Sequence, residues 1–334
     1  MKFKGLLALI LVVGLVLMAG SAKAANSMSD NVPGNGAFAY FYATPDCIST
    51  LVAIFNIDTT ANWIHIIAKD QDSKHVWDAD LCLTHKGTAV LMVYADANGI
   101  YINGIGGEAI GQINNEKLFM TPDENGAYMG YINVVAVSPD KGTNTATACS
   151  GAPVIGQPVG DDPLVVTTAL VQGNWWVGIN AAMVQRLTDP DVDDLTGDVG
   201  TSMLAGRECV TLYGRWYDDP NTRGNLVLVF PVGMDNTNCF VGTCPEETPY
   251  PITGYSYDEN QNRRSFTRCV KEANMIPFGT VLPDVGSGSG WVEIDNTTAS
   301  AFGYVIVENG LQADAAPLFK KGESGSCPTC ETSE

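Results

Sequence analysis

The sequence predicts an all-β protein, built as an antiparallel β-sandwich of the jelly-roll or immunoglobulin-like type. Short segments rich in Val, Ile, Leu and aromatic residues recur along the chain, and polar breakers separate them, which is the pattern of strands joined by turns. Stretches with the 3.6-residue period of a helix are nearly absent. Nine cysteines make disulfides a further expected feature of the fold. The pattern fits one large sandwich or two packed sandwiches.

Residues 1–24 are expected to be a signal peptide. Lys2 and Lys4 precede the apolar run Gly5–Met18, and Ala22 and Ala24 offer an A-x-A cleavage site. The apolar run is shorter than the about 20 residues that span a bilayer core. We therefore expect a secreted protein, extracellular or at the cell surface, with the periplasm as an alternative, and no insertion into a membrane.

The chain is strongly acidic. It contains 18 Lys and Arg against 37 Asp and Glu, a net charge of −19, and loss of the signal peptide removes three of the basic residues and none of the acidic ones. An acidic surface repels the phosphate groups of nucleic acids and of anionic lipids, so neither is an expected partner. Such a surface attracts cations, and calcium is the one cofactor that the sequence suggests.

The first half of the sandwich is expected over residues 37–157. Residues 25–36 are polar with Gly and Pro and predict a flexible N-terminal arm. Residues 37–42 read AFAYFY, which predicts a strand, and a meander of five short strands follows from Cys47 to Tyr101. Another strand is expected over residues 127–138.

The second half is expected over residues 158–312. Its predicted strands read PLVVTTALVQ, NWWVGINAAMV, ECVTLYGRWYDD, NLVLVFPV, WVEID and AFGYVIVENG. The fully apolar strand among them, residues 225–232, is typical of a sandwich interior. Residues 313–334 read as a polar tail that contains a C-x-x-C motif.

All the cysteines lie in the exported part of the chain, where an oxidising compartment favours disulfides. They are Cys47, Cys82, Cys149, Cys209, Cys239, Cys244, Cys269, Cys327 and Cys330. Because the number is odd, one thiol is left over or bridges to another chain. The expected pairs are Cys47 with Cys82, Cys149 with Cys209, and Cys269 with either Cys239 or Cys244.

One acidic loop is a candidate calcium site. Asp189, Asp191 and Asp193 match the alternating ligand positions of a calcium-binding loop, and Asp198 lies in the same cluster. The loop departs from that pattern where Asp194 replaces the turn glycine and where Gly200 replaces the bidentate Glu. A solvated acidic loop is the alternative interpretation.

Two further groups of residues are candidate sites. Trp175, Trp176 and Trp216 would form a sugar-binding platform if they faced outward, although strand aromatics often belong to the core. Asp78 and Asp80 share one strand face, and hairpin numbering places His65 opposite Asp78 or Ala79. A hydrolase built on these last residues is the weakest hypothesis, because no catalytic motif accompanies them.

Several segments together resemble a known group of proteins. They are VWDADLCL, GYINVVAV, NLVLVFP, YDENQNRR followed by CVKEANMIPFG, and SGWVEID. In this combination the chain resembles an uncharacterised family of secreted β-sandwich surface proteins from anaerobic environmental bacteria. The resemblance implies a location and a fold, and no activity.

These observations favour a secreted, non-enzymatic structural or interaction protein of the cell surface or extracellular matrix. Its expected partners are other copies of itself or other surface proteins. In a sharper form of this hypothesis, the AFAYFY strand adds to a neighbouring sandwich and builds a filament or a layer, and a spare thiol locks the subunits. The alternative is a calcium-assisted, adhesin-like module that binds a glycan.

Overall fold

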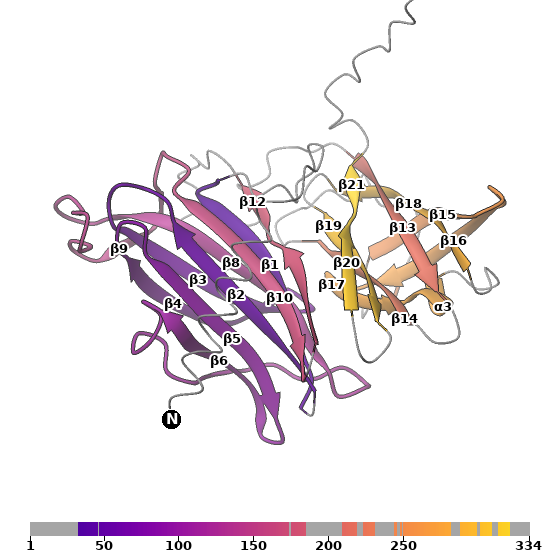
Figure 1. The fold of residues 1–334 in the computed structure, drawn as a ribbon, viewed down its shortest axis with the longest axis horizontal. Helices are drawn as coiled ribbons and strands as arrows, with labels where there is room; N and C mark the ends of the chain where they lie inside the picture. The colour runs from indigo at the N-terminus through magenta and orange to yellow at the C-terminus, as the bar shows by residue number, and fades with distance from the viewer. Residues whose placement is uncertain are drawn as a thin grey trace, which may run out of the picture.

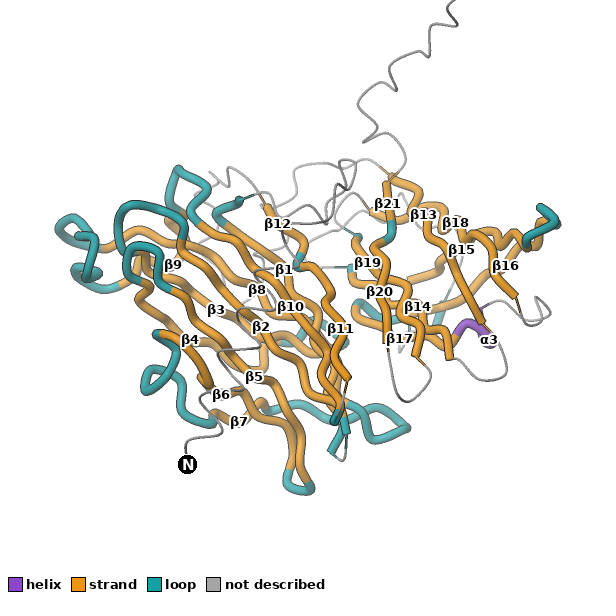
Figure 2. The backbone as a smooth tube through the Cα atoms, in the orientation of Figure 1, coloured by secondary structure: helices purple, strands orange, loops and turns teal. Residues whose placement is uncertain are grey.

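A computed structural model describes residues 33–45, 47–173, 175–184, 209–218, 223–230, 244–245, 248, 250–281, 288–298, 301–308 and 313–320. The described chain is all-β, as the sequence predicts, with one four-residue helix, α3 (Phe278–Val281). Four antiparallel sheets form two sandwiches, one coloured indigo to magenta and the other orange to yellow in Figure 1. Figure 2 shows how completely strands make up both of them.

The first sandwich consists of sheets I and II. In order across the sheet, sheet I contains β11 (Trp175–Asn180), β10 (Leu164–Gln172), β2 (Ile48–Asn56), β5 (Thr88–Asp96), β6 (Gly99–Gly107) and β7 (Glu116–Leu118). Sheet II contains β12 (Ala182–Val184), β1 (Gly36–Ala43), β8 (Tyr128–Pro139), β3 (Asn62–Asp70) and β4 (His75–Leu83), and β9 (Pro153–Pro158) pairs with β8.

The second sandwich consists of sheets III and IV. Sheet III contains β17 (Ala273–Pro277), β14 (Arg223–Val229), β19 (Phe302–Glu308) and β20 (Ala313–Pro317). Sheet IV contains β16 (Arg263–Val270), β15 (Tyr250–Asp258), β18 (Gly288–Thr298), β13 (Cys209–Asp218) and β21 (Phe319–Lys320).

The sheets stack in the order I, II, III, IV, and a separate hydrophobic core fills each gap. Strand β1 shows why: Ala37, Ala39 and Phe41 pack toward sheet I, whereas Phe38 and Tyr40 pack toward sheet III. Because neighbouring strand residues point to opposite faces, a strand covered on both sides must be apolar at every position. The continuous AFAYFY run is the sequence of such a central strand.

The middle core joins the two sandwiches. Sheet III alternates in the same way, since Val227 and Val229 of β14 pack toward sheet II while Leu226 and Leu228 pack toward sheet IV. Residues of β10 and β11 contribute to the middle core beside those of sheet II. The two sandwiches therefore share buried apolar surface.

Polar contacts also cross between the sandwiches. The backbone N–H groups of Glu272 and Ala273 donate to the carbonyl of Gln71, at 3.1 and 3.3 Å. Lys271 Nζ lies 2.9 Å from Asp72 Oδ1. These bonds attach the turn between β3 and β4 to the start of β17.

The sandwiches divide later in the chain than the boundary expected at 157/158. Strand β10 pairs with β2 over its whole length, β11 pairs with β10, and β12 pairs with β1, so all three belong to the first sandwich. At the other end, residues 313–320 of the expected tail supply β20 and β21. The segments predicted to be strands are strands in the structure. Which sandwich each strand belongs to became clear only from the strand pairing.

The segment expected to be donated to a neighbour is used within the chain itself. Strand β1 pairs with β8 from Gly36 to Ala43 and with β12 at its start. Its side chains are buried on both faces apart from half-buried Tyr42. The hypothesis that this segment is donated to a neighbouring molecule rested on its being free, and the structure does not support that premise.

Candidate functional site

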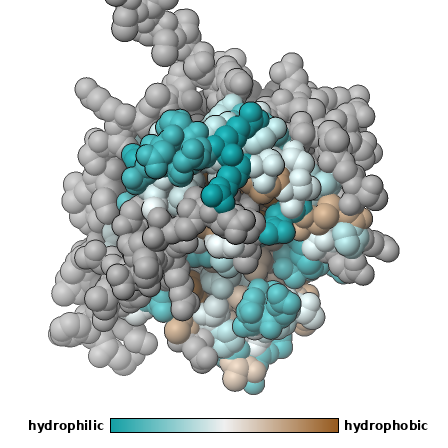
Figure 3. Space-filling view, turned by 90° about the vertical axis from the view of Figure 1, so that its right-hand side faces the viewer, coloured by the Kyte–Doolittle hydropathy of each residue, from teal (hydrophilic) through white to brown (hydrophobic). Residues whose placement is uncertain are grey.

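Sheet IV has one buried face and one outward face. Trp216, Phe266 and Val292 alternate into the core against sheet III. Between them, the strands turn aromatic and charged side chains away from the core. We call this set the aromatic face, and it consists of Tyr213, Arg215, Tyr255, Tyr257, Arg263, Trp291 and Glu293. Figure 3 views the molecule from the side of the second sandwich, where the described surface is hydrophilic or intermediate in hydropathy with some hydrophobic patches.

The strand register aligns these side chains in rows. Tyr257 of β15 pairs with Arg263 on one side and with Trp291 on the other, and Trp291 pairs with Arg215. The first row therefore reads Arg, Tyr, Trp, Arg across four strands. Directly opposite residues on one face of a sheet are close enough to interact. Trp291 is 45% exposed, which is unusual for so large an indole.

The second row is built around a carboxylate. Glu293 is directly opposite Tyr255 on β15 and Tyr213 on β13. Its Oε1 accepts a hydrogen bond from the Tyr213 hydroxyl at 3.2 Å, and its Oε2 accepts one from the Tyr257 hydroxyl at 3.1 Å. Partial burial, then this hydrogen bond and the charge of Glu293, raise the pKa of Tyr257 above its usual value. The two rings are thus fixed by the acid between them.

Both arginines of the face lie over aromatic rings. The guanidinium carbon of Arg215 lies 5.6 Å from the ring centre of Trp291, and that of Arg263 lies 3.4 Å from the ring centre of Tyr255. These distances are typical of cation–π contacts. Stacking orients a planar guanidinium and leaves its N–H groups free to bind an acceptor.

The outward side of sheet IV carries side chains that form hydrogen bonds. Besides the aromatic face, it presents Thr211, Thr253, Ser265, Thr267, Ser289 and Asp295. None of the outward residues named in these rows is aliphatic. Chemically the arrangement can hold a flat ligand with a weakly polar ring face and many hydroxyl or anionic groups, because aromatic surfaces and hydrogen-bonding groups lie side by side.

The sugar platform expected from the sequence is placed differently. Trp216 is only 2% exposed and lies in the core, where its Nε1 donates to the carbonyl of Tyr257 at 3.2 Å, so its assignment as a sugar-binding residue is wrong. Trp176 is half-buried on β11 of the first sandwich. The side chain of Trp175 lies outside the described residues.

The aromatic face was missed at the sequence level, although the residues that form it follow a simple rule. Two residues apart on a strand means the same face, so Trp291 and Glu293 belong together, as do Tyr255 and Tyr257. The sequence did not show which face of β18 points outward. In its segment GWVEID both faces carry apolar side chains, Trp291 on one and Val292 and Ile294 on the other.

The histidine and aspartate cluster is partly assembled. His65 Nδ1 lies 2.8 Å from Asp80 Oδ1, and His75 Nε2 lies 3.2 Å from Asp78 Oδ1. The expectation that His65 opposes Asp78 or Ala79 is wrong, because a register shift between Ala68 and Lys69 moves the pairing. His65 is buried and each acid engages a different histidine, so no pair of free carboxylates faces a cleft.

The candidate calcium ligands cannot be placed. Asp189, Asp191, Asp193 and Asp198 all lie outside the described residues. Within the part of the chain that is described, no group of three or more His, Cys, Asp or Glu is arranged to hold a metal ion. The calcium hypothesis stays a prediction.

The disulfides differ from the expected pairs in part. Cys82 bonds to Cys149, which corrects both Cys47–Cys82 and Cys149–Cys209, whereas Cys269 bonds to Cys244, one of its two expected partners. Cys47 is a free, exposed thiol beside the turn from β1 to β2. The side chain of Cys209, and the whole of Cys239, Cys327 and Cys330, lie outside the described residues.

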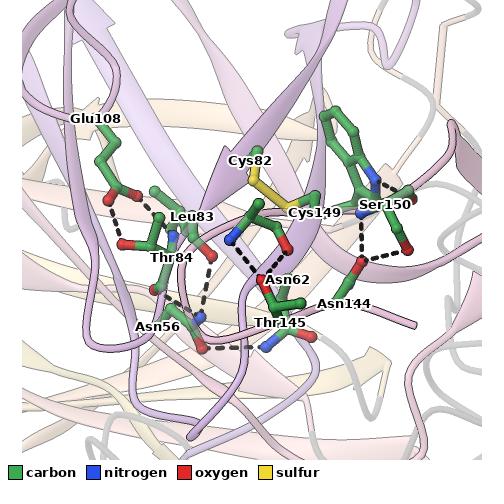
Figure 4. The surroundings of a disulfide bond; sticks show 12 residues. Asn56, Asn62, Cys82, Leu83, Thr84, Glu108, Asn144, Thr145, Cys149 and Ser150 are labelled. Carbon is green, nitrogen blue, oxygen red and sulfur yellow. Dashed lines mark hydrogen bonds between the residues drawn. A yellow bond between two sulfur atoms is a disulfide. The ribbon is translucent and has the colours of Figure 1, made fainter. Parts of the chain in front are cut away.

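The first disulfide fastens a loop across one end of the first sandwich (Figure 4). Beside it, the amide of Asn56 donates to the carbonyls of Thr60, Leu83 and Thr84 at 2.8 to 3.1 Å. Asn62 Nδ2 in turn donates to Asn56 Oδ1 at 3.1 Å. These bonds satisfy the backbone where several strands end, so this polar cluster has a structural role.

Among the described residues, none of the helices has the length and apolar character that a membrane crossing requires. Comparisons with protein-family models, with curated proteins and with solved structures give no match, so the argument for function rests on the residues of this chain.

Proposed function

We propose that this protein is a secreted, non-enzymatic interaction protein of the cell surface or extracellular matrix, and that it binds carbohydrate through the aromatic face. The observation that carries this proposal is the row in which Tyr257 and exposed Trp291 lie between two arginines on an outward sheet face. Two disulfides are compatible with an extracellular location.

The chemistry of the face supports a sugar ligand. One side of a pyranose ring presents C–H groups that pack on an aromatic ring, while its hydroxyl groups need hydrogen-bond partners. Trp291 offers the ring, and Tyr213, Tyr257 and Glu293 offer hydroxyl and carboxylate oxygens next to it. Tyr, Trp and Arg are also enriched in protein interfaces, but the cores of those interfaces are apolar, unlike this hydroxyl-rich face.

Affinity electrophoresis through gels that contain a soluble glucan, a mannan or polygalacturonate tests the proposal. We expect at least one polysaccharide to retard the mature protein, and Trp291→Ala to weaken that binding about fivefold, since aromatic contacts contribute about 1 kcal/mol. Phe119→Ala is the matched control, because Phe119 is a 79% exposed aromatic on the first sandwich. Retardation by none of the polysaccharides, or equal loss in both variants, would contradict the proposal.

Covalent self-association is a second candidate, and the free exposed thiol of Cys47 favours it. An exposed thiol in an oxidising compartment can bridge two copies of the chain. We expect a fraction of the native protein to run as a dimer on non-reducing gels and Cys47→Ser to remove it. A native mass that is purely monomeric under oxidising conditions would exclude this candidate.

A further inference from the structure

We propose that the ligand of the aromatic face is an acidic polysaccharide, a chain of sugars that carry carboxylate groups, and that Arg215 and Arg263 each bind one carboxylate. This inference rests on the proposed carbohydrate-binding function and adds the chemistry of the ligand. It starts from the place of the two arginines at the ends of the first row.

The row sets the spacing of the two arginine backbones. Arg263 and Arg215 are separated by three strand spacings, which places their Cα atoms about 14 Å apart. Tyr257 and Trp291 lie between them. A sugar chain that crosses the strands would thus stack on the central rings and reach an arginine at either end.

The guanidinium groups are prepared to bind carboxylates. Each is held over a ring, Arg215 over Trp291 and Arg263 over Tyr255. Among the described residues, neither forms an ion pair with an acidic side chain. A planar guanidinium oriented in this way can donate two parallel hydrogen bonds to one carboxylate, which is the strongest common form of that contact.

The acids near the row are already engaged by local donors. Glu293 accepts from two tyrosines, Asp295 from Thr211, Glu259 from Ser289, and Asp258 from Asn260 and Asn262. Each of these carboxylates therefore already has a donor within the protein, while Arg215 and Arg263 are exposed. These hydrogen bonds leave the carboxylates charged, so the preference for an anionic ligand depends on direct contact with the two guanidinium groups.

The distribution of arginine along the chain supports the same conclusion. The first 185 residues contain no arginine, and four of the seven arginines of the chain lie on β13 and β16 of sheet IV. Arg215 and Arg263 belong to its outward side, whereas Arg264 and Arg268 lie on the alternate positions of β16. The Debye length at physiological ionic strength is about 8 Å, so a polyanion bound at sheet IV would respond mainly to the charges of that sheet itself.

The test compares polygalacturonate with its methyl ester, in which the same backbone has lost its charge. We expect the mature protein to bind the acid form about tenfold more tightly in isothermal titration, because the ester cannot form charge-assisted hydrogen bonds with the two arginines. The double variant Arg215→Gln/Arg263→Gln should abolish the preference. Arg264→Gln removes the same charge from the other face of β16 and should keep it.

The outcomes separate this inference from the function on which it rests. Equal binding of the acid and the ester overturns the inference and leaves the carbohydrate-binding function standing. Equal binding of polyglutamate overturns it as well, because charge alone would then suffice. If neither polysaccharide binds, this inference fails, and the carbohydrate-binding function fails with it only when the glucan and the mannan do not retard the protein either. Unchanged thermal unfolding midpoints show that the variants are folded.

Discussion

Adjacent residues of β18 point alternately into the core and toward the outward face of sheet IV, and this alternation creates the candidate site. Val292 and Ile294 are fully buried, while Trp291 and Glu293 face outward. The sequence alone indicated strands here, and the two-residue period groups Trp291 with Glu293. The sequence did not indicate which face of β18 points outward, because the choice of face depends on where sheet III packs. For the same reason the sequence left open whether Trp216 faces outward, and the structure places it in the core.

At the scale of single residues, we expect Glu293→Gln to lower the pKa of Tyr257. Burial, the hydrogen bond to Glu293 and the charge of Glu293 raise that pKa together, and the substitution removes the charge. The expected result is an earlier phenolate transition when the absorbance near 295 nm is followed with rising pH. Tyr257→Phe identifies which part of the titration belongs to Tyr257. An unchanged curve would show that Glu293 does not fix this ring.

At the scale of strands and loops, local sequence indicated which segments are strands and left open which strands pair. The apolar runs of β1, β8 and β14 were recognisable because strands buried on both faces lack polar positions. The assignment of β10, β11 and β12 to the first sandwich was not, since pairing joins segments far apart in the chain. The Cys82–Cys149 bond is another such long-range feature.

That disulfide is expected to stabilise the first sandwich. It closes a loop with a sequence separation of 67 residues, and the loss of unfolded-state entropy for a loop of this length corresponds to about 4 kcal/mol. The double variant Cys82→Ser/Cys149→Ser should lower the free energy of unfolding in urea by about that amount. Cys47→Ser, which removes an exposed unpaired thiol, should leave it within about 0.5 kcal/mol.

At the scale of the whole molecule, the contact between the sandwiches contains a carboxyl group with an altered pKa. Burial raises the pKa of Glu272 to about 7, against the hydrogen bond from Tyr250 and the charge of Lys69. Asp72 and Asp70, across the contact, raise it further. Glu272 Oε2 is buried and has no hydrogen-bond partner among the described residues. The protonated form therefore suits this site better than the carboxylate.

The stability of the protein should depend on pH through this group. Because the folded pKa of Glu272 lies above its unfolded value of 4.5, its favourable contribution is fully present below pH 4.5 and is lost as the pH rises to about 7. Glu272→Gln should thus be more stable than the native protein at pH 8 by about 3 kcal/mol, with a smaller difference at pH 4.5. Urea unfolding at the two pH values measures this, and a difference that does not change with pH would contradict it.

Because sheets II and III bury their facing sides against each other, the two sandwiches cannot be separated into fragments without exposing the core between them. A fragment that ended at residue 184 would leave Phe38, Tyr40 and Tyr131 in contact with water, and a fragment that began at residue 209 would do the same to Val227 and Tyr304. Neither half is suited to existence as a soluble piece. Proteins expressed for crystallography or for display should therefore contain both sandwiches.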